Sequence, residues 1–147
     1  MTKRELYAKL NAVRDLDDAI AVVQIKIEKL ESSASGMHAI RYDKDWVQST
    51  PSDPIDKFIA ELSKHTDRLN ELRAQMAEAI DEVGSIIDLA EDRNERMVLY
   101  YRYVSGLSWA SVARRMHLSE RHVFRVHDAG IEKIFKKCQS MSVNVRE

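Results

Sequence analysis

A regular apolar stripe between Ile55 and Ala90 constrains the fold of this chain more than any other feature of its sequence. Its members follow one another at alternating intervals of four and three residues: Ile55, Ile59, Leu62, Thr66, Leu69, Arg73, Met76, Ile80, Val83, Ile87 and Ala90. This is the heptad spacing of a coiled coil, with Thr66 and Arg73 as polar interruptions. The spacing predicts a helix over 54–91, which would be about 54 Å long at 1.5 Å per residue. So long a helix needs an extended partner to cover its stripe.

A second stripe in residues 2–31 supplies that partner. Its members are Leu6, Leu10, Val13, Leu16, Ile20, Val23, Ile27 and Leu30, spaced three or four apart as on one face of a helix. Residues 32–54 contain both Pro, one of the four Gly and six Ser or Thr, which is the composition of a loop. We therefore expect helices over about 2–31 and 54–91, joined by a loop over 32–53 into an antiparallel hairpin. Ser52 or Asp53 would cap the second helix.

Part of this hairpin is expected to remain uncovered. The first helix is the shorter one and carries extra apolar residues such as Val22 and Ile25, which leaves room for a homodimer through the hairpin. Trp46 and Val47 lie within the predicted loop, and we expect them to pin it to a helix surface. A role for these two side chains in binding a partner is the alternative.

The composition predicts an all-α fold. Four Gly and two Pro in 147 residues are few for strands joined by tight turns. No stretch approaches the roughly 18 uncharged apolar residues of a membrane span, and the first ten residues lack the apolar segment of a secretory signal. Together with the single Cys138, which suits a reducing compartment, these features predict a cytoplasmic protein that does not enter the membrane.

The last third of the chain reads as three short helices. Asp92 caps the first, with Glu95 three residues on, and Gly106 ends it where a left-handed residue is wanted. Ser108 caps the second helix and Ser119 the third. We therefore expect a tri-helical domain over 92–137 after the hairpin of 1–91, with a tail over 138–147.

Charge is segregated along the chain in the same way. Residues 1–92 hold 12 Lys or Arg against 19 Asp or Glu, a net charge of −7, whereas residues 93–137 hold 10 against 4, a net charge of +6. The basic segment is the candidate anion-binding surface. A solvated helix face without a ligand is the plainer alternative.

The segment 106–134 resembles the helix-turn-helix of sigma-70 region 4. The positions that carry the resemblance are Gly106, Leu107, Ser108, Val112, Ala113, Met116, Leu118, Ser119, Val123 and Val126. Small Ala113 suits the crossing of two helices. His117 departs from the family, which usually has Gly in the turn, but histidine enters the left-handed region more readily than most residues.

If Val123 and Val126 point inward, the outer face of the third helix carries Glu120, Arg121, Phe124, Arg125 and Asp128. The resemblance implies that the first four contact bases: arginine on guanine, glutamate on cytosine and phenylalanine on a thymine methyl group. For Phe124, packing against the first helix of the domain is an equal alternative. The residues expected at DNA phosphates are Ser108, Arg114, Arg115, Ser119, His122, Lys133, Lys136 and Lys137.

Residues 93–134 also resemble the C-terminal part of the RinA/ArpU-like group, phage-encoded regulators of late-gene transcription in Gram-positive hosts. The quoted stretches are RYVSGLSW and SERHVFRVH. The resemblance implies a DNA-binding transcription regulator, expected to activate phage late or packaging genes beside the host RNA polymerase in the bacterial cytoplasm.

The sequence also bears on enzymatic, metal-binding and other DNA- or protein-binding functions. The sequence has neither a Gly-rich phosphate loop after a strand nor a catalytic triad order, so we expect no enzyme and no cofactor. We expect no metal site, because His122 and His127 are five residues apart, and we expect the histidines to lie on the surface or at phosphates. Two alternatives remain: a DNA-packaging adaptor similar to a terminase small subunit, and a sigma-like module that binds protein rather than DNA.

Overall fold

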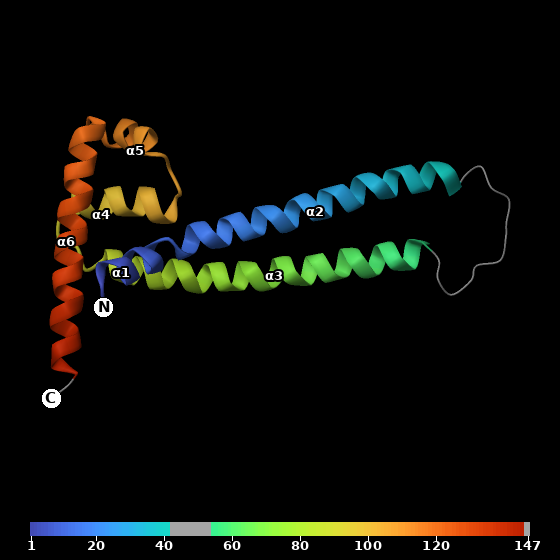
Figure 1. Ribbon diagram of the computed structural model, residues 1–147. Coiled ribbons are helices and arrows are strands. Elements are labelled where there is room, and N and C mark those ends of the chain that lie inside the picture. The colour runs from blue at the N-terminus through green and yellow to red at the C-terminus, as the bar shows by residue number, and fades with distance from the viewer. Residues whose placement is uncertain (42–53, 146–147) are drawn as a thin grey trace. The chain divides into compact units, whose positions relative to one another are not determined.

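Helices form every regular element in the computed structural model, which describes residues 1–41 and 54–145, with side chains for 1–34 and 54–145. In chain order they are α1 (Lys3–Leu10), α2 (Ala12–Arg41), α3 (Pro54–Ile87), α4 (Arg93–Leu99), the π-helical turn η1 (Tyr100–Val104), α5 (Trp109–Met116) and α6 (Glu120–Asn144) (Figure 1). The all-α class predicted from the composition is confirmed. Within these residues no helix combines the length and the apolar character needed to span a membrane.

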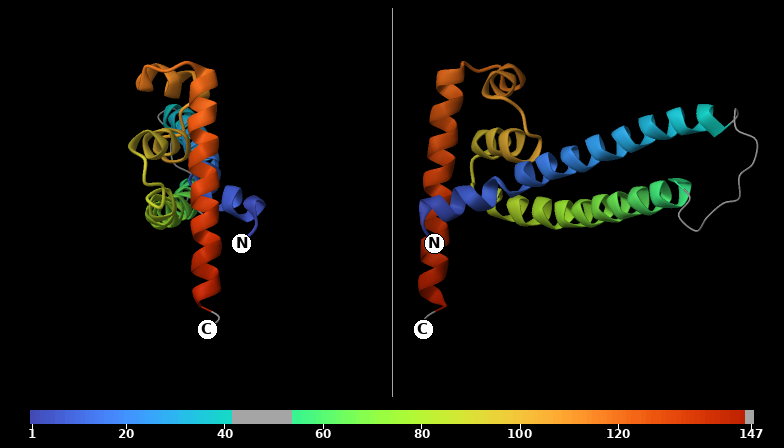
Figure 2. Two further views of the ribbon diagram at one scale, coloured as in Figure 1. Left: turned by 90° about the vertical axis from the view of Figure 1, so that its left-hand side faces the viewer. Right: turned by 45° about the vertical axis from the view of Figure 1, so that its right-hand side comes forward.

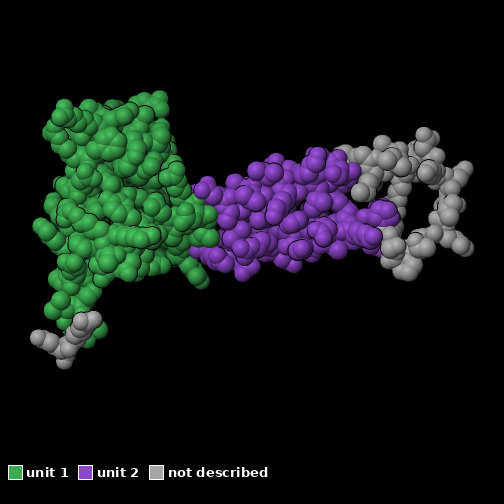
Figure 3. Space-filling model, viewed as in Figure 1, with its two compact units in different colours: residues 1–16, 76–147 green, residues 17–75 purple. Residues whose placement is uncertain are grey.

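The chain packs as two compact units (Figure 3). One consists of residues 1–16 and 76–147, and the other of residues 17–75, so that both α2 and α3 contribute to each. These units divide the chain elsewhere than at Asp92, the boundary expected from the sequence. The division at Asp92 between the hairpin and the tri-helical domain stays a prediction.

The N-terminal helical segment differs from the prediction of one helix over 2–31. A capping box starts α1: the Thr2 hydroxyl accepts from the Glu5 backbone N–H at 3.2 Å, and the Glu5 carboxylate accepts from that of Thr2 at 2.7 Å. α1 ends at Leu10, with Asn11 as its C-cap, and α2 then continues to Arg41 rather than stopping near Ser32. The hydroxyls of Ser32 and Ser33 donate to the carbonyls four residues earlier, at 2.9 Å each, so they are satisfied inside the helix.

The predicted loop over 32–53 is therefore wrong in its first ten residues. Trp46 and Val47 lie outside the described residues.

α3 buries a different stripe from the one expected. Thr66, Arg73 and Ile80 are exposed, whereas Leu72 and Ala79 are buried. Counting from Leu69, the sequence allows the heptad to continue after four residues, to Arg73, or after three, to Leu72. Both series contain apolar residues, and the protein uses the interval of three. The helix also ends at Ile87 rather than near 91, because the N–H groups of Leu89 and Ala90 bond to carbonyls only three residues back.

Within the unit of residues 17–75, α2 and α3 lie side by side and run in opposite directions (Figures 1 and 2). Their buried apolar side chains are Val23, Leu69 and Leu72. Val22, Ile25 and Ile59 are exposed.

The other unit contains two apolar clusters. The larger joins α1, the end of α3, α4, η1 and α6, with the fully buried members Leu6, Leu10, Ile87, Leu99 and Ile134. The smaller joins α4, α5 and α6 through the buried side chains of Val98, Val112, Ala113 and Val123. Because α6 contributes to both clusters, packing on two sides fixes the helix that carries the candidate base-contacting residues.

The last helix is longer than expected. α6 continues from the predicted third helix through the tail of 138–147 as far as Asn144. The hydroxyls of Ser140 and Ser142 donate to backbone carbonyls of their own helix, at 2.8 and 2.9 Å, which lets a serine-containing tail stay helical.

Candidate nucleic-acid interface

The segment between α5 and α6 is a tight turn closed by hydrogen bonds at both ends. His117 adopts the left-handed conformation, with φ 55° and ψ 39°, as predicted. The N–H of His117 donates to the Arg114 carbonyl at 3.3 Å, and that of Leu118 to the Ala113 carbonyl at 3.0 Å, the pair of bonds that defines a Schellman motif. The turn therefore has a defined geometry although a non-Gly residue occupies its left-handed position.

Serine side chains start both helices of this pair, as expected. The hydroxyl of Ser108 accepts from the N–H of Ser111, and that of Ser119 from the N–H of His122, each at 3.2 Å. The Ser108 hydroxyl also donates to the Ser111 hydroxyl at 3.0 Å. The Asp92 carboxylate caps α4 in the same way, accepting from the N–H of Glu95 at 3.1 Å.

Packing of the pair directs the candidate base-contacting residues outward. Ala113 and Val123 are buried where α5 meets α6, as expected for the crossing point. The four residues on the opposite face of α6 are all exposed: Glu120, Arg121, Phe124 and Arg125. They occupy its first two turns and so form one continuous surface.

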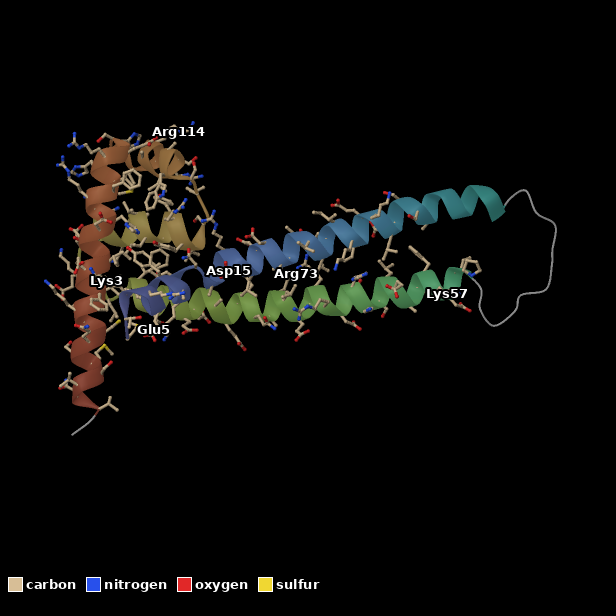
Figure 4. All side chains as sticks on the ribbon, in the orientation of Figure 1. Lys3, Glu5, Asp15, Lys57, Arg73 and Arg114 are labelled. Atoms are coloured by element: carbon tan, nitrogen blue, oxygen red, sulfur yellow. The ribbon has the colours of Figure 1, made fainter. Side chains whose placement is uncertain are left out.

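Basic side chains surround this surface. Arg114 and Arg115 at the end of α5, and His122 in the first turn of α6, are exposed beside Arg121 and Arg125 (Figure 4 labels Arg114). Arg114 donates to the Ser111 hydroxyl at 3.2 Å, and the Arg115 guanidinium lies 5.7 Å from the centre of the Tyr101 ring. In the described part of the chain, none of the five forms an ion pair with an acidic side chain.

The lysines expected at phosphates lie farther along α6 and are not equivalent. Lys133 donates to Glu95 at 2.6 Å, and Lys137 donates to Glu91 at 2.7 Å. The bond to Glu95 raises the pKa of Lys133, and the bond to Lys137 lowers the pKa of Glu91. Lys136 is exposed and, within the described residues, forms no ion pair. Of the three lysines, it is the one whose charge is not already matched by a carboxylate.

Sequence reasoning missed a group of aromatic and charged residues behind the outer face. Trp109, the first residue of α5, lies with its ring centre 4.9 Å from that of Phe124. The guanidinium of Arg102 lies 4.5 Å from the centre of the Trp109 ring, on the π face, and its Nη1 donates to the Leu107 carbonyl at 3.0 Å. Phe124 thus packs on a residue of the second helix of the predicted domain.

The prediction of a surface or phosphate-contacting position for His127 is wrong, because His127 is only 5% exposed. Its Nε2 lies 2.8 Å from the Tyr103 hydroxyl and its Nδ1 lies 3.0 Å from an Asp128 carboxylate oxygen. Burial lowers the pKa of His127 and raises the pKa of Tyr103 to about 12. The signal was in the spacing: Val123, His127 and Ile131 follow one another every four residues on the inner face of α6.

The surroundings of these groups define what chemistry the surface offers. Among the described residues, no three His, Cys, Asp or Glu side chains gather closely enough to hold a metal ion. The candidate base- and phosphate-contacting groups are mostly hydrogen-bond donors and cations, with the Glu120 carboxylate and the Phe124 ring among them. Such a set suits recognition of a polyanion that also presents hydrogen-bonding and methyl groups. No match to this chain was found among protein-family models, curated proteins or solved structures.

Proposed function

We propose that this protein is a sequence-specific transcription regulator that binds double-stranded DNA through α5 and α6. The observation that carries the proposal is the capped turn at His117, which leaves Glu120, Arg121, Phe124 and Arg125 exposed on the first two turns of α6. In a helix-turn-helix, the N-terminal residues of the second helix are the ones that reach base edges in the major groove. The resemblance of 106–134 to sigma-70 region 4 supports the same assignment.

The proposed division of labour follows from charge and position. Arg121 and Arg125 donate to guanine, and Glu120 accepts from the amino group of cytosine. Arg114, Arg115, His122 and Lys136 contact phosphates, together with the N-terminal turns that Ser108 and Ser119 cap. For Lys133 and Lys137, a phosphate contact requires exchange of the carboxylate that each already binds. Their contribution to DNA affinity should therefore be the smaller one.

The resemblance to RinA/ArpU-like regulators gives the proposed biological role: activation of phage late genes beside the host RNA polymerase, in the cytoplasm of the bacterial cell. The antiparallel α2 and α3 provide the proposed surface for a second copy of the chain or for polymerase. Val22, Ile25 and Ile59 are exposed on these two helices, and they are the apolar side chains that such a partner would cover.

The proposal is tested by measuring fluorescence anisotropy of labelled duplexes, both a random-sequence duplex and one selected by the protein from a random library. Affinity should fall steeply with salt, as expected when several phosphates are neutralised. Arg125→Ala should weaken the selected duplex by about 1–3 kcal/mol and leave the random duplex nearly unchanged. Lys136→Ala, on the same helix, should weaken both duplexes equally and reduce the salt slope by about 1.

Three results would contradict the proposal in whole or in part. Equal losses from Arg125→Ala on both duplexes would remove the division between base and phosphate contacts. No salt-dependent binding to either duplex would leave α5 and α6 as a protein-binding module. A ring-sized assembly in size-exclusion chromatography would instead favour a DNA-packaging adaptor over a regulator.

A further inference from the structure

Phe124 is an aromatic residue among charged side chains on the outer face of α6. Its side chain is 42% exposed among charged neighbours on α6, yet one side of its ring is in contact with Trp109, at 4.9 Å between ring centres and an angle of 50°. Tilted aromatic pairs at this separation are attractive beyond the area they bury. The contact restricts the rotamers of Phe124 while part of its surface stays exposed.

Trp109 is itself held by two further groups. Arg102 lies over its π face, 4.5 Å from the ring centre, and the His127 ring packs against it in a T-shaped arrangement, with 4.9 Å between ring centres and 84° between the ring planes. Each group is fixed in turn: Arg102 donates to the Leu107 carbonyl, and His127 is hydrogen-bonded to Tyr103 and Asp128. Trp109 is thus a rigid support, whose position is set by η1, by the loop before α5 and by α6.

We propose that Trp109 is a specificity-determining positioning residue, which holds Phe124 against the 5-methyl group of a thymine in the major groove. The inference rests on the proposed function. Thymine is the only one of the four bases that carries a methyl group on its major-groove edge, and covering that methyl with an exposed apolar ring removes apolar surface of both groups from water. A free phenylalanine would lose rotamer freedom on binding, whereas Phe124 has already lost it to Trp109.

The test replaces thymine by uracil, which removes the methyl group and keeps every hydrogen-bonding group. A duplex selected by the protein from a random library is resynthesised with each thymine in turn changed to deoxyuridine. For the unmodified protein, one change should weaken binding about fourfold, the value expected for one buried methyl group. Phe124→Ala should bind the thymine and uracil duplexes equally.

Trp109 is tested with two variants that differ in their ability to stack. Trp109→Phe keeps an aromatic face and should retain most of the methyl dependence, whereas Trp109→Leu should reduce it below about twofold. Phe135→Ala is the control for Phe124→Ala, because it removes a phenylalanine from the same helix, α6, outside the proposed interface. It should leave the ratio at about fourfold. A general loss of folding lowers affinity for both duplexes and does not change their ratio, so the ratio reports positioning.

The inference is overturned if no thymine in the selected duplex shows methyl dependence, or if Trp109→Leu keeps the full ratio. Binding without methyl dependence would refute the role of Trp109 and leave the proposed function intact. Absence of DNA binding by the unmodified protein would refute both.

Discussion

Two ion pairs of α6 have the same spacing in sequence, but the carboxylate is buried in one pair and exposed in the other. Lys133 and Lys137, four residues apart, bind Glu95 and Glu91, which are also four residues apart. Glu95 is 6% exposed, and its second carboxylate oxygen is buried with no hydrogen-bond partner in the described part of the protein. The side chain of Glu91 is 84% exposed. Water can therefore replace Lys137 as the partner of Glu91, but cannot replace Lys133 in the same way.

This difference predicts unequal effects of removing the two lysines. Lys133→Met leaves the buried Glu95 carboxylate unpaired, which should lower the free energy of unfolding by about 1–3 kcal/mol. Lys137→Met is the matched control on the same helix, and its effect should be close to that of a neutral surface change. Urea denaturation followed by circular dichroism measures both. Equal midpoints for the two variants would show that Glu95 is stabilised by something other than Lys133.

Single residues also show where prediction from the sequence succeeds. Asp92, Ser108 and Ser119 were predicted as caps, and His117 as left-handed, because each of these roles depends on hydrogen bonds within a few residues. His127 could not be assigned by residue type, because its partner Tyr103 is 24 positions away. Only the four-residue spacing with Val123 and Ile131 indicated its inward position.

At the scale of elements, the packing of α4 on α6 depends on Gly130. A Cβ atom at this position would lie 3.2 Å from Leu99 Cδ1 and 3.3 Å from Glu95 Cβ. Leu99 is fully buried, and the Cβ of Glu95 moves only with the backbone of α4. Neither neighbour has room to yield, so the glycine sets how closely the two helices approach.

Gly130→Ala should therefore destabilise the protein although alanine is the better helix former. The propensity gain of about 1 kcal/mol is outweighed by overpacking, which costs about 1–3 kcal/mol. Thermal unfolding measures the net loss, and Gly130→Val should lose more. The exposed neighbour serves as a control: Ala129→Gly should lose about 1 kcal/mol from propensity alone. A Gly130→Ala protein more stable than the parent would show that α4 and α6 can separate freely.

Element boundaries were less predictable than caps, for a physical reason. The heptad of α3 permits intervals of three or four after Leu69, and the choice between Leu72 and Arg73 depends on the partner helix rather than on α3 itself. Ser32 and Ser33 read as loop residues by composition, yet inside α2 their hydroxyls bond to the helix backbone. The existence and type of the long helices were predictable, but their buried face and their ends were not.

At the scale of the whole molecule, buried apolar side chains are distributed unevenly between the two units. Of the 18 buried apolar residues in the described part of the chain, only Val23, Leu69 and Leu72 belong to residues 17–75. The other 15 belong to residues 1–16 and 76–145, which also contain the proposed DNA-binding surface. Local stability follows burial, so the two units should differ in how readily they open.

Amide hydrogen exchange should therefore divide the protein at the limits of these units. The N–H groups of 17–34 and 54–75 should exchange faster than those of 79–87 and 123–134, because fewer buried contacts must break to expose them. Leu72→Ala, which truncates a buried side chain in the unit with fewer buried apolar residues, should lower the local stability of 17–34 and 54–75 by about 2–4 kcal/mol and so speed exchange there. The same variant should leave exchange in 123–134 unchanged, because α6 has its core in the other unit. The affinity of Leu72→Ala for a selected DNA duplex should also equal that of the unmodified protein. A uniform increase of exchange over the whole chain would mean that the two units unfold as one, and that α3 transmits the loss at Leu72 into the core beneath α6.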